Sequence, residues 1–104
     1  MADHLIFHEC TPPTKEAIQN YWQKKQQRFE KLLVHFPEDQ RNLRLTIRRC
    51  PERYEAHAVL TLPTGTLVAE TNSHGRDYLE ALDIVADRLV EEIRRHKDHL
   101  SIRF

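Results

Sequence analysis

The sequence predicts an α+β domain in the order β-α-β-β-β-α: a four-stranded sheet with two parallel helices packed on one face. Two long segments, 15–35 and 77–99, repeat apolar residues every three to four positions, which is the period of an amphipathic helix. The segments 42–49 and 54–62 alternate apolar with polar residues, which is typical of half-buried strands. A chain of 104 residues has room for one hydrophobic core, so we expect a single domain over residues 1–104.

The N-terminal part is predicted to hold one strand and the first helix. Residues 5–10 are expected to form the strand, with Leu5 and Phe7 on the same side. The prolines that follow break the chain, and Thr14 is the expected N-cap because its hydroxyl can accept from a free amide of the first turn. The apolar face of the helix consists of Ile18, Trp22, Phe29, Leu32 and Leu33. Pro37 ends the helix, because proline disfavours helical geometry at the residue before it.

Three more strands complete the predicted sheet. In residues 42–49 three aliphatic side chains point one way, and Arg44 and Arg48 point the other way. A proline-glycine turn at 63–65 joins the third strand to a fourth at 66–71. The strand-helix-strand start implies a right-handed crossover and parallel first strands, whereas short turns pair the others antiparallel. Both helices should cover the apolar face, which leaves the arginine-bearing face open to water.

The last helix has its charges graded along its axis. Acidic residues come first and basic residues last, an order that suits the helix dipole. Asp77 or Ser73 is expected near its N-cap. The topology makes the two helices parallel, so we expect their basic C-terminal halves to lie at the same end of the domain.

The composition excludes several classes of partner and compartment. Sixteen basic and sixteen acidic side chains cancel, so a nucleic acid would have to be bound by a local patch. No run approaches the ~20 apolar residues of a membrane span, and the N-terminus does not resemble a secretion signal. Cys10 and Cys50 lack metal-ligand spacing, which favours reduced thiols and a cytoplasmic protein. A disulfide between them would require α-carbons within about 7 Å.

The titratable residues do not form a catalytic or metal pattern. His96 and His99 are three apart on one helix, without the second motif that a zinc site would need. Glu91 and Glu92 are adjacent and point about 100° apart, which makes a poor acid-base pair. We therefore expect no enzyme, no cofactor, no metal and no small-molecule substrate.

Two basic clusters are candidates for binding phosphates. The first lies on the helices: Lys24, Arg28, Lys31 and His35 share one face, and the last helix adds further arginines. The second consists of Arg41, Arg44, Arg48, Arg49 and Arg53. Either cluster can also be a solvated face, and for the second we favour charge that prevents sheet stacking, because no aromatic residues are interleaved.

Several segments together resemble a known family. The last helix carries a dense set of matching residues: Asp83, Asp87, Leu89, His96, Lys97 and Leu100. The hairpin turn at 62–65 and four residues of the first helix, Tyr21, Lys25, Arg28 and Lys31, match as well. These features resemble the ribosome hibernation-promoting factor and ribosome-associated inhibitor family, once called sigma-54 modulation proteins. Because the sequence ends at Phe104, we expect the short form of that family.

The resemblance implies a function and a set of binding residues. The chain would bind the small ribosomal subunit, through its 16S-type RNA, in the channel for messenger and transfer RNA, and would inhibit translation in hibernating ribosomes under stress. The expected RNA-binding residues are Lys24, Lys25, Arg28, Lys31, Arg88, Arg94, Arg95, His96 and Lys97. The alternative is a diverged protein-interaction module of the same fold, favoured by the neutral net charge and by Glu91, which stands where the family commonly has arginine.

Overall fold

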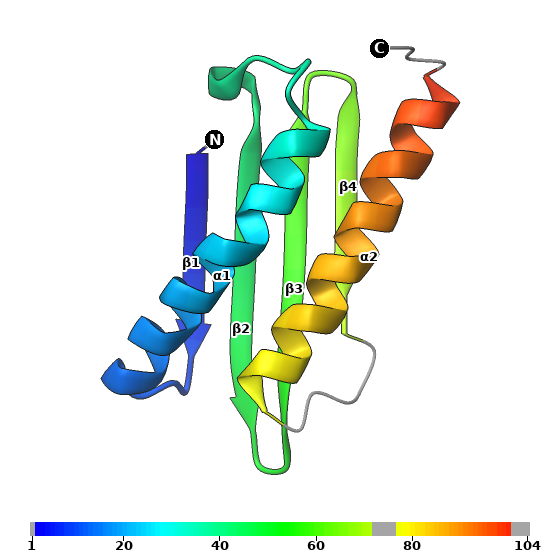
Figure 1. Cartoon of the computed structure of the whole chain (residues 1–104). Helices are drawn as coiled ribbons and strands as arrows, with labels where there is room; N and C mark the ends of the chain where they lie inside the picture. Colours follow the sequence, from blue (N-terminus) through cyan, green and yellow to red (C-terminus); the bar gives the residue numbers. More distant parts are fainter. Residues whose placement is uncertain (1, 72–76, 101–104) are drawn as a thin grey trace.

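The computed structural model of the chain describes residues 2–71 and 77–100. A four-stranded sheet, in the order β1-β2-β3-β4, carries both long helices on one face (Figure 1). The elements are β1 (Ala2–His8), α1 (Pro12–Leu32), the 3-10 helix η1 (Glu38–Gln40), β2 (Asn42–Cys50), β3 (Arg53–Leu62), β4 (Gly65–Glu70) and α2 (Tyr78–His99). The predicted fold class and element order are confirmed.

The strand pairing follows the expected topology. β1 pairs parallel to β2, with Leu5 opposite Leu45, and the β2-β3 and β3-β4 pairs are antiparallel. Both helices run in the same direction, so their C-terminal ends lie at the same end of the sheet (Figure 1). The domain is flat, with principal extents of 43 × 24 × 18 Å.

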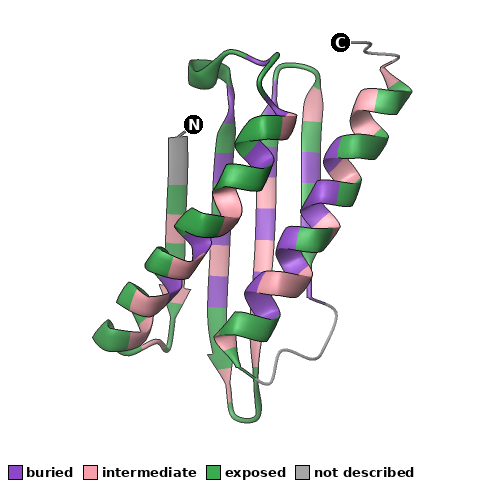
Figure 2. Cartoon of the chain, viewed as in Figure 1, coloured by how far each residue is buried: buried purple, intermediate pink, exposed green. Residues whose placement is uncertain are grey.

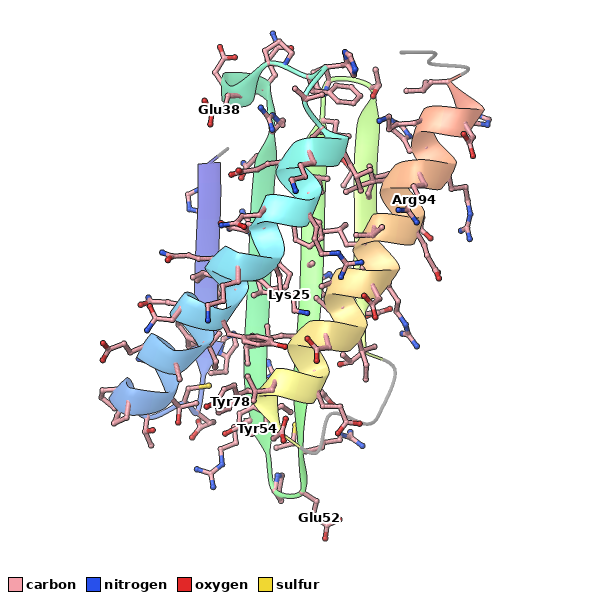
Figure 3. The ribbon with its side chains drawn as sticks, in the orientation of Figure 1. Lys25, Glu38, Glu52, Tyr54, Tyr78 and Arg94 are labelled. Atoms are coloured by element: carbon pink, nitrogen blue, oxygen red, sulfur yellow. The ribbon has the colours of Figure 1, made fainter. Side chains whose placement is uncertain are left out.

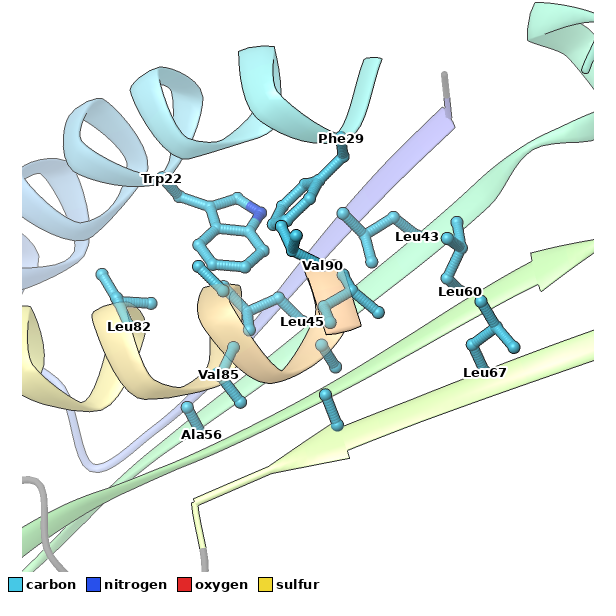
Figure 4. Close-up of a cluster of buried hydrophobic side chains, with 14 of the residues drawn as sticks. Trp22, Phe29, Leu43, Leu45, Ala56, Leu60, Leu67, Leu82, Val85 and Val90 are labelled. Atoms are coloured by element: carbon cyan, nitrogen blue, oxygen red, sulfur yellow. The ribbon is translucent and has the colours of Figure 1, made fainter. Parts of the chain in front are cut away.

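The core lies between the sheet and the helices. In β2, Leu43, Leu45 and Ile47 are buried beneath α1 and α2, as the alternation predicts. Trp22 and Phe29 point into this layer with ring centroids 5.5 Å apart, so Trp22 is a core residue (Figure 4). Figure 2 shows buried positions on the sheet-facing sides of the helices and exposed positions on their outer sides.

The first helix differs from the prediction at both ends. It begins at Pro12, with Thr11 as the N-cap residue in place of Thr14. Prolines are tolerated there because amides in the first turn have no intrahelical partner. The helix ends at Leu32 with Leu33 as the C-cap residue, and Leu33 and Phe36 are both buried in the core. His35 therefore lies beyond the helix, so it does not extend the helical stripe that the sequence predicted.

Other boundaries also shift. β1 ends at His8 and excludes Cys10, because Glu9 adopts a left-handed backbone with φ 61°. Cys10 and Cys50 are both free thiols. Asp77 is the N-cap of α2, with its carboxylate accepting from the Glu80 amide at 2.8 Å; the alternative, Ser73, lies outside the described residues.

The second arginine cluster is divided between environments. Arg41 is 9% exposed and is covered, which corrects its assignment to the exposed sheet face. Arg44, Arg48 and Arg49 are exposed, and Arg53 pairs with Glu55 at 2.9 Å.

In the described part of the chain, no helix has the length and hydrophobicity needed to cross a membrane. Nor do these residues include a group of three or more side chains suited to hold a metal ion.

Candidate nucleic-acid interface

The two helices are joined by a carboxylate on α2. Asp83 Oδ1 accepts from the Tyr21 hydroxyl at 2.5 Å and from the Lys25 ammonium at 2.8 Å. The Lys25 ammonium also lies 5.2 Å from the centroid of the Tyr21 ring, within reach of a cation–π interaction. Figure 3 shows Lys25 extending from α1 toward α2.

The contacts among Asp83, Tyr21 and Lys25 shift the pKa values of all three side chains. Burial alone would raise the pKa of the Asp83 carboxyl, but hydrogen bonds from Lys25 and Tyr21, with the charges of Lys25 and Arg28, lower it overall. The hydrogen bond to Asp83 raises the pKa of Lys25 and also that of the Tyr21 hydroxyl. Asp83 and Lys25 are thus held as an ion pair, and Lys25, with its side chain 23% exposed, serves to cross-link the helices.

Arg28 makes a second, more open link one turn further along. Its Nη1 donates to Asp87 Oδ1 at 2.9 Å, with the Arg28 and Asp87 side chains 46% and 68% exposed. A guanidinium has five N–H donors, and Asp87 engages one of them. Asp87 therefore holds Arg28 in place while the rest of its planar fork faces solvent, which is a suitable geometry for a phosphate.

Lys97 brings the C-terminal ends of the helices together. Its ammonium donates to the Leu32 carbonyl, in the last turn of α1, at 2.9 Å. This contact agrees with the expectation that the basic ends of two parallel helices lie side by side. A carbonyl at a helix C-terminus lacks an intrahelical partner, so the contact also completes the end of α1.

Three other predicted residues lie on the opposite side of α2, beside β4 and its turn. Arg88 Nη1 donates to the Glu70 carbonyl, and Arg95 Nη1 pairs with Glu92 at 2.8 Å. A hollow of about 290 Å³ at this position is lined by Val68, Ala69, Glu70, Arg88, Glu91 and Glu92. His96 hydrogen-bonds to Thr64 at 2.7 Å and packs against the β3-β4 turn. These three residues lie away from the contact between α1 and α2 that Asp83 and Asp87 form. Carboxylates lie next to both Arg88 and Arg95.

The remaining predicted cations are open to solvent. Lys24, Lys31 and Arg94 are exposed, and no residue in the described ranges 2–71 and 77–100 forms a hydrogen bond or ion pair with them. Lys24, Arg28 and Lys31 are four and three residues apart on α1, and Arg94 continues the Asp83-Asp87 stripe of α2. Figure 3 shows Arg94 toward the C-terminal end of α2. We call Lys24, Arg28, Lys31 and Arg94 the helix-face cations.

The sequence reasoning missed the roles of Asp83 and Asp87 as partners of predicted RNA-binding residues. A signal for them was present in the spacing. The two aspartates are four residues apart on α2, and their partners Lys25 and Arg28 are three apart on α1. On two parallel helices, such spacings allow two ion pairs to form in consecutive turns.

Comparisons with known proteins agree with this architecture. The sequence profile of the family described as "Sigma 54 modulation protein / S30EA ribosomal protein" matches residues 13–101. A ribosomal subunit interface protein from Coxiella burnetii has a similar fold, with a TM-score of 0.63 and 17% identity, over 94% of this chain and 99% of that chain. The N-terminal domain of Protein Y from Thermus thermophilus gives a TM-score of 0.71 and 21% identity, over 91% of this chain and 98% of that chain.

At these identities the two structures support the fold, and the sequence profile supports the family. The match extends over most of the chain and includes both helices and the three strands β2 to β4. The chain belongs to the Sigma 54 modulation protein / S30EA ribosomal protein family.

Proposed function

We propose that this protein binds the small ribosomal subunit in the channel for messenger and transfer RNA, and so keeps ribosomes inactive. Membership of the family supports a ribosome-associated role. The fold shared with a protein named for the ribosomal subunit interface, and with Protein Y, supports the same reading. The proposed activity is binding without catalysis, in the cytoplasm, with no cofactor and no small-molecule substrate.

The observation that carries the proposal is the group of helix-face cations. Three of its members have no partner among the described residues, and Arg28 is held by Asp87 with most of its donors open. Lysine and arginine contacts to phosphate fix position without reading sequence, which suits a protein that recognises a folded RNA by its shape.

The structure also predicts how strong the electrostatic contribution is. Acceptors of the protein itself engage Lys25 and Arg88, and Arg95 lies beside Glu92 on the other side of α2, which leaves about four phosphate contacts on the helix face. Each contact contributes roughly 0.7–0.9 to the slope of log affinity against log salt, so the helix face should give a slope of about −3. This moderate value is consistent with a chain whose net charge is zero.

The test is sedimentation of the protein with small ribosomal subunits at two or more salt concentrations. The variant Lys24→Gln/Lys31→Gln/Arg94→Gln removes the three helix-face cations that pair with no described residue, and it should reduce the steepness of the salt slope by roughly 2 to 3. The control Arg95→Gln changes an arginine that lies beside Glu92 on the other side of α2, away from the helix-face cations, and should bind like the wild type. Equal binding by the triple variant and the wild type would show that these cations are not the site.

A protein-interaction module is the second candidate. The hollow beside Arg88, lined by Glu70, Glu91 and Glu92, is the observation that favours it, because carboxylates repel phosphates. On this alternative the protein would fail to sediment with ribosomal subunits even at low salt. Stable binding that weakens with salt would exclude it.

A further inference from the structure

The open face of the sheet, away from the helices, carries two arginines that pair with no other described residue. Arg44 and Arg48 are exposed on β2, and neither has a hydrogen bond or ion pair to any other described residue. Glu55 lies directly opposite Arg48 on β3, yet its carboxylate pairs with Arg53 at 2.9 Å. A nearby acid therefore exists, but it is engaged by a different arginine.

The neighbouring strand places two histidines beside these arginines. In the parallel β1-β2 register His4 is opposite Arg44 and His8 is opposite Arg48, and both histidines are exposed. Adjacent strands lie about 4.8 Å apart, and residues four apart on one strand lie roughly 13 Å apart. The four side chains thus form a compact patch. We call His4, His8, Arg44 and Arg48 the sheet-face patch.

On this face the basic and acidic side chains lie on different pairs of strands. The described side chains of β1 and β2, residues 4–8 and 42–50, include no carboxylate. The acids lie on β3 and β4: Glu55 is bound to Arg53, and Glu70 accepts from His57 at 3.3 Å. A hollow of about 290 Å³ next to Arg48 is bordered by those two acids. An anion would therefore be drawn to the β1-β2 half of the face.

Charged side chains that serve only to prevent two sheets from stacking would not need to be sorted into a basic half and an acidic half. Acidic, basic or internally paired side chains serve that purpose equally well. Here the cations are gathered on one half, and the acids that could neutralise them are engaged elsewhere on the same face. This arrangement makes the β1-β2 half a polyanion-binding surface in its own right.

We propose that the sheet-face patch binds a second segment of ribosomal RNA backbone, so that the domain bridges RNA on two sides. The inference rests on the proposed function and extends it to the opposite face. The thinnest extent of the domain is 18 Å, and the helix-face cations and the sheet-face patch lie on opposite broad faces. A flat body of this kind, placed in a channel with RNA walls, can contact both walls at once, and two linked contacts bind more tightly than either alone.

The test compares two double variants that remove the same charge. Arg44→Gln/Arg48→Gln removes the arginines of the sheet-face patch. The control Arg88→Gln/Arg95→Gln removes two arginines of α2 that lie outside both cation groups, where Arg88 donates to the Glu70 carbonyl and Arg95 pairs with Glu92. Binding to small ribosomal subunits is measured across a salt series. The first variant should flatten the log–log slope by roughly 1.4–1.8 and weaken binding at least about tenfold, whereas the control should change the slope by less than about 0.5. Circular dichroism and thermal unfolding verify that each variant is folded.

A photocrosslinker at Thr46, between the two arginines on β2, gives an independent readout. On this proposal it should crosslink to ribosomal RNA in the bound complex. Crosslinking only to ribosomal protein, or equal salt slopes for the two double variants, would overturn the inference. If that happens while the helix-face triple variant binds weakly, the proposed function stands; if the wild type does not bind ribosomal subunits, both fail.

Discussion

The Asp83 cluster gives the sharpest prediction about stability, because a matched control lies one turn away. Asp83→Asn keeps the shape and helix propensity of the residue but removes its charge. The Tyr21 hydroxyl would then donate to a neutral acceptor, and the Lys25 ammonium would lose its counterion. Asp87→Asn makes the same change in a pair whose two side chains are 46% and 68% exposed.

The expected magnitudes follow from the hydrogen bonds and the exposure. A hydrogen bond to a charged group contributes ~1.5–3 kcal/mol against ~1 kcal/mol for a neutral one, so weakening the Tyr21 bond costs about 1 kcal/mol. The Lys25-Asp83 ion pair is partly exposed, which limits its contribution to about 0.5–1 kcal/mol. The sum of about 1.5–2 kcal/mol corresponds to a fall in Tm of roughly 6–16 °C in a domain of this size. Asp87→Asn should cost about 0.5 kcal/mol or less.

The assay is thermal unfolding followed by circular dichroism as a function of pH. Because the pKa of Asp83 is lower in the folded protein, its charge stabilises the fold above the pKa of an unfolded aspartate. The Tm difference between wild type and Asp83→Asn should therefore be full near neutral pH and should shrink as pH falls toward the folded pKa. A larger effect of Asp87→Asn than of Asp83→Asn, or a Tm difference that does not change on acidification, would refute the reasoning.

Three further outcomes are expected. Asp77→Ala removes the carboxylate that accepts from the Glu80 amide and should lower stability by about 1 kcal/mol, measured by denaturant unfolding. Gly65→Ala should cost roughly 1–3 kcal/mol in the same assay, because Gly65 has φ +155° and a Cβ there would lie 3.1 Å from the His96 ring; an unchanged midpoint would contradict this. Burial raises the pKa of the Cys10 thiol above its ordinary value, so its alkylation rate should level off at a higher pH than that of a free thiol.

Local patterns were sufficient to predict the sheet. The alternation around Leu45 in β2 predicts which side chains face the helices. A shift of the strand register by one residue would move the apolar side chains from the core to the solvent-exposed face. The short turn at Gly65 fixed the antiparallel pairing of β3 with β4. The start of α1 was misplaced because proline both breaks helices and is tolerated in a first turn, so Pro12 alone does not distinguish the two cases.

The candidate site was less accessible to sequence reasoning. Spacing within one helix showed that Lys24, Arg28 and Lys31 share a face, but not which cations the protein neutralises itself. That depends on how α1 and α2 are aligned along their axes, and Asp83 and Lys25 are 58 positions apart in sequence. The same limit explains Arg88, whose partner is a backbone carbonyl of β4.

The contact between Lys97 and the Leu32 carbonyl makes the two helix ends interdependent. Helices usually fray independently at their termini, because each last turn has carbonyls that only water satisfies. Here an ammonium from the last turns of α2 satisfies a carbonyl in the last turn of α1, so melting of one end exposes the other. The C-terminal turns of the two helices should therefore open as one unit in amide hydrogen exchange, although they are joined in sequence only through three strands.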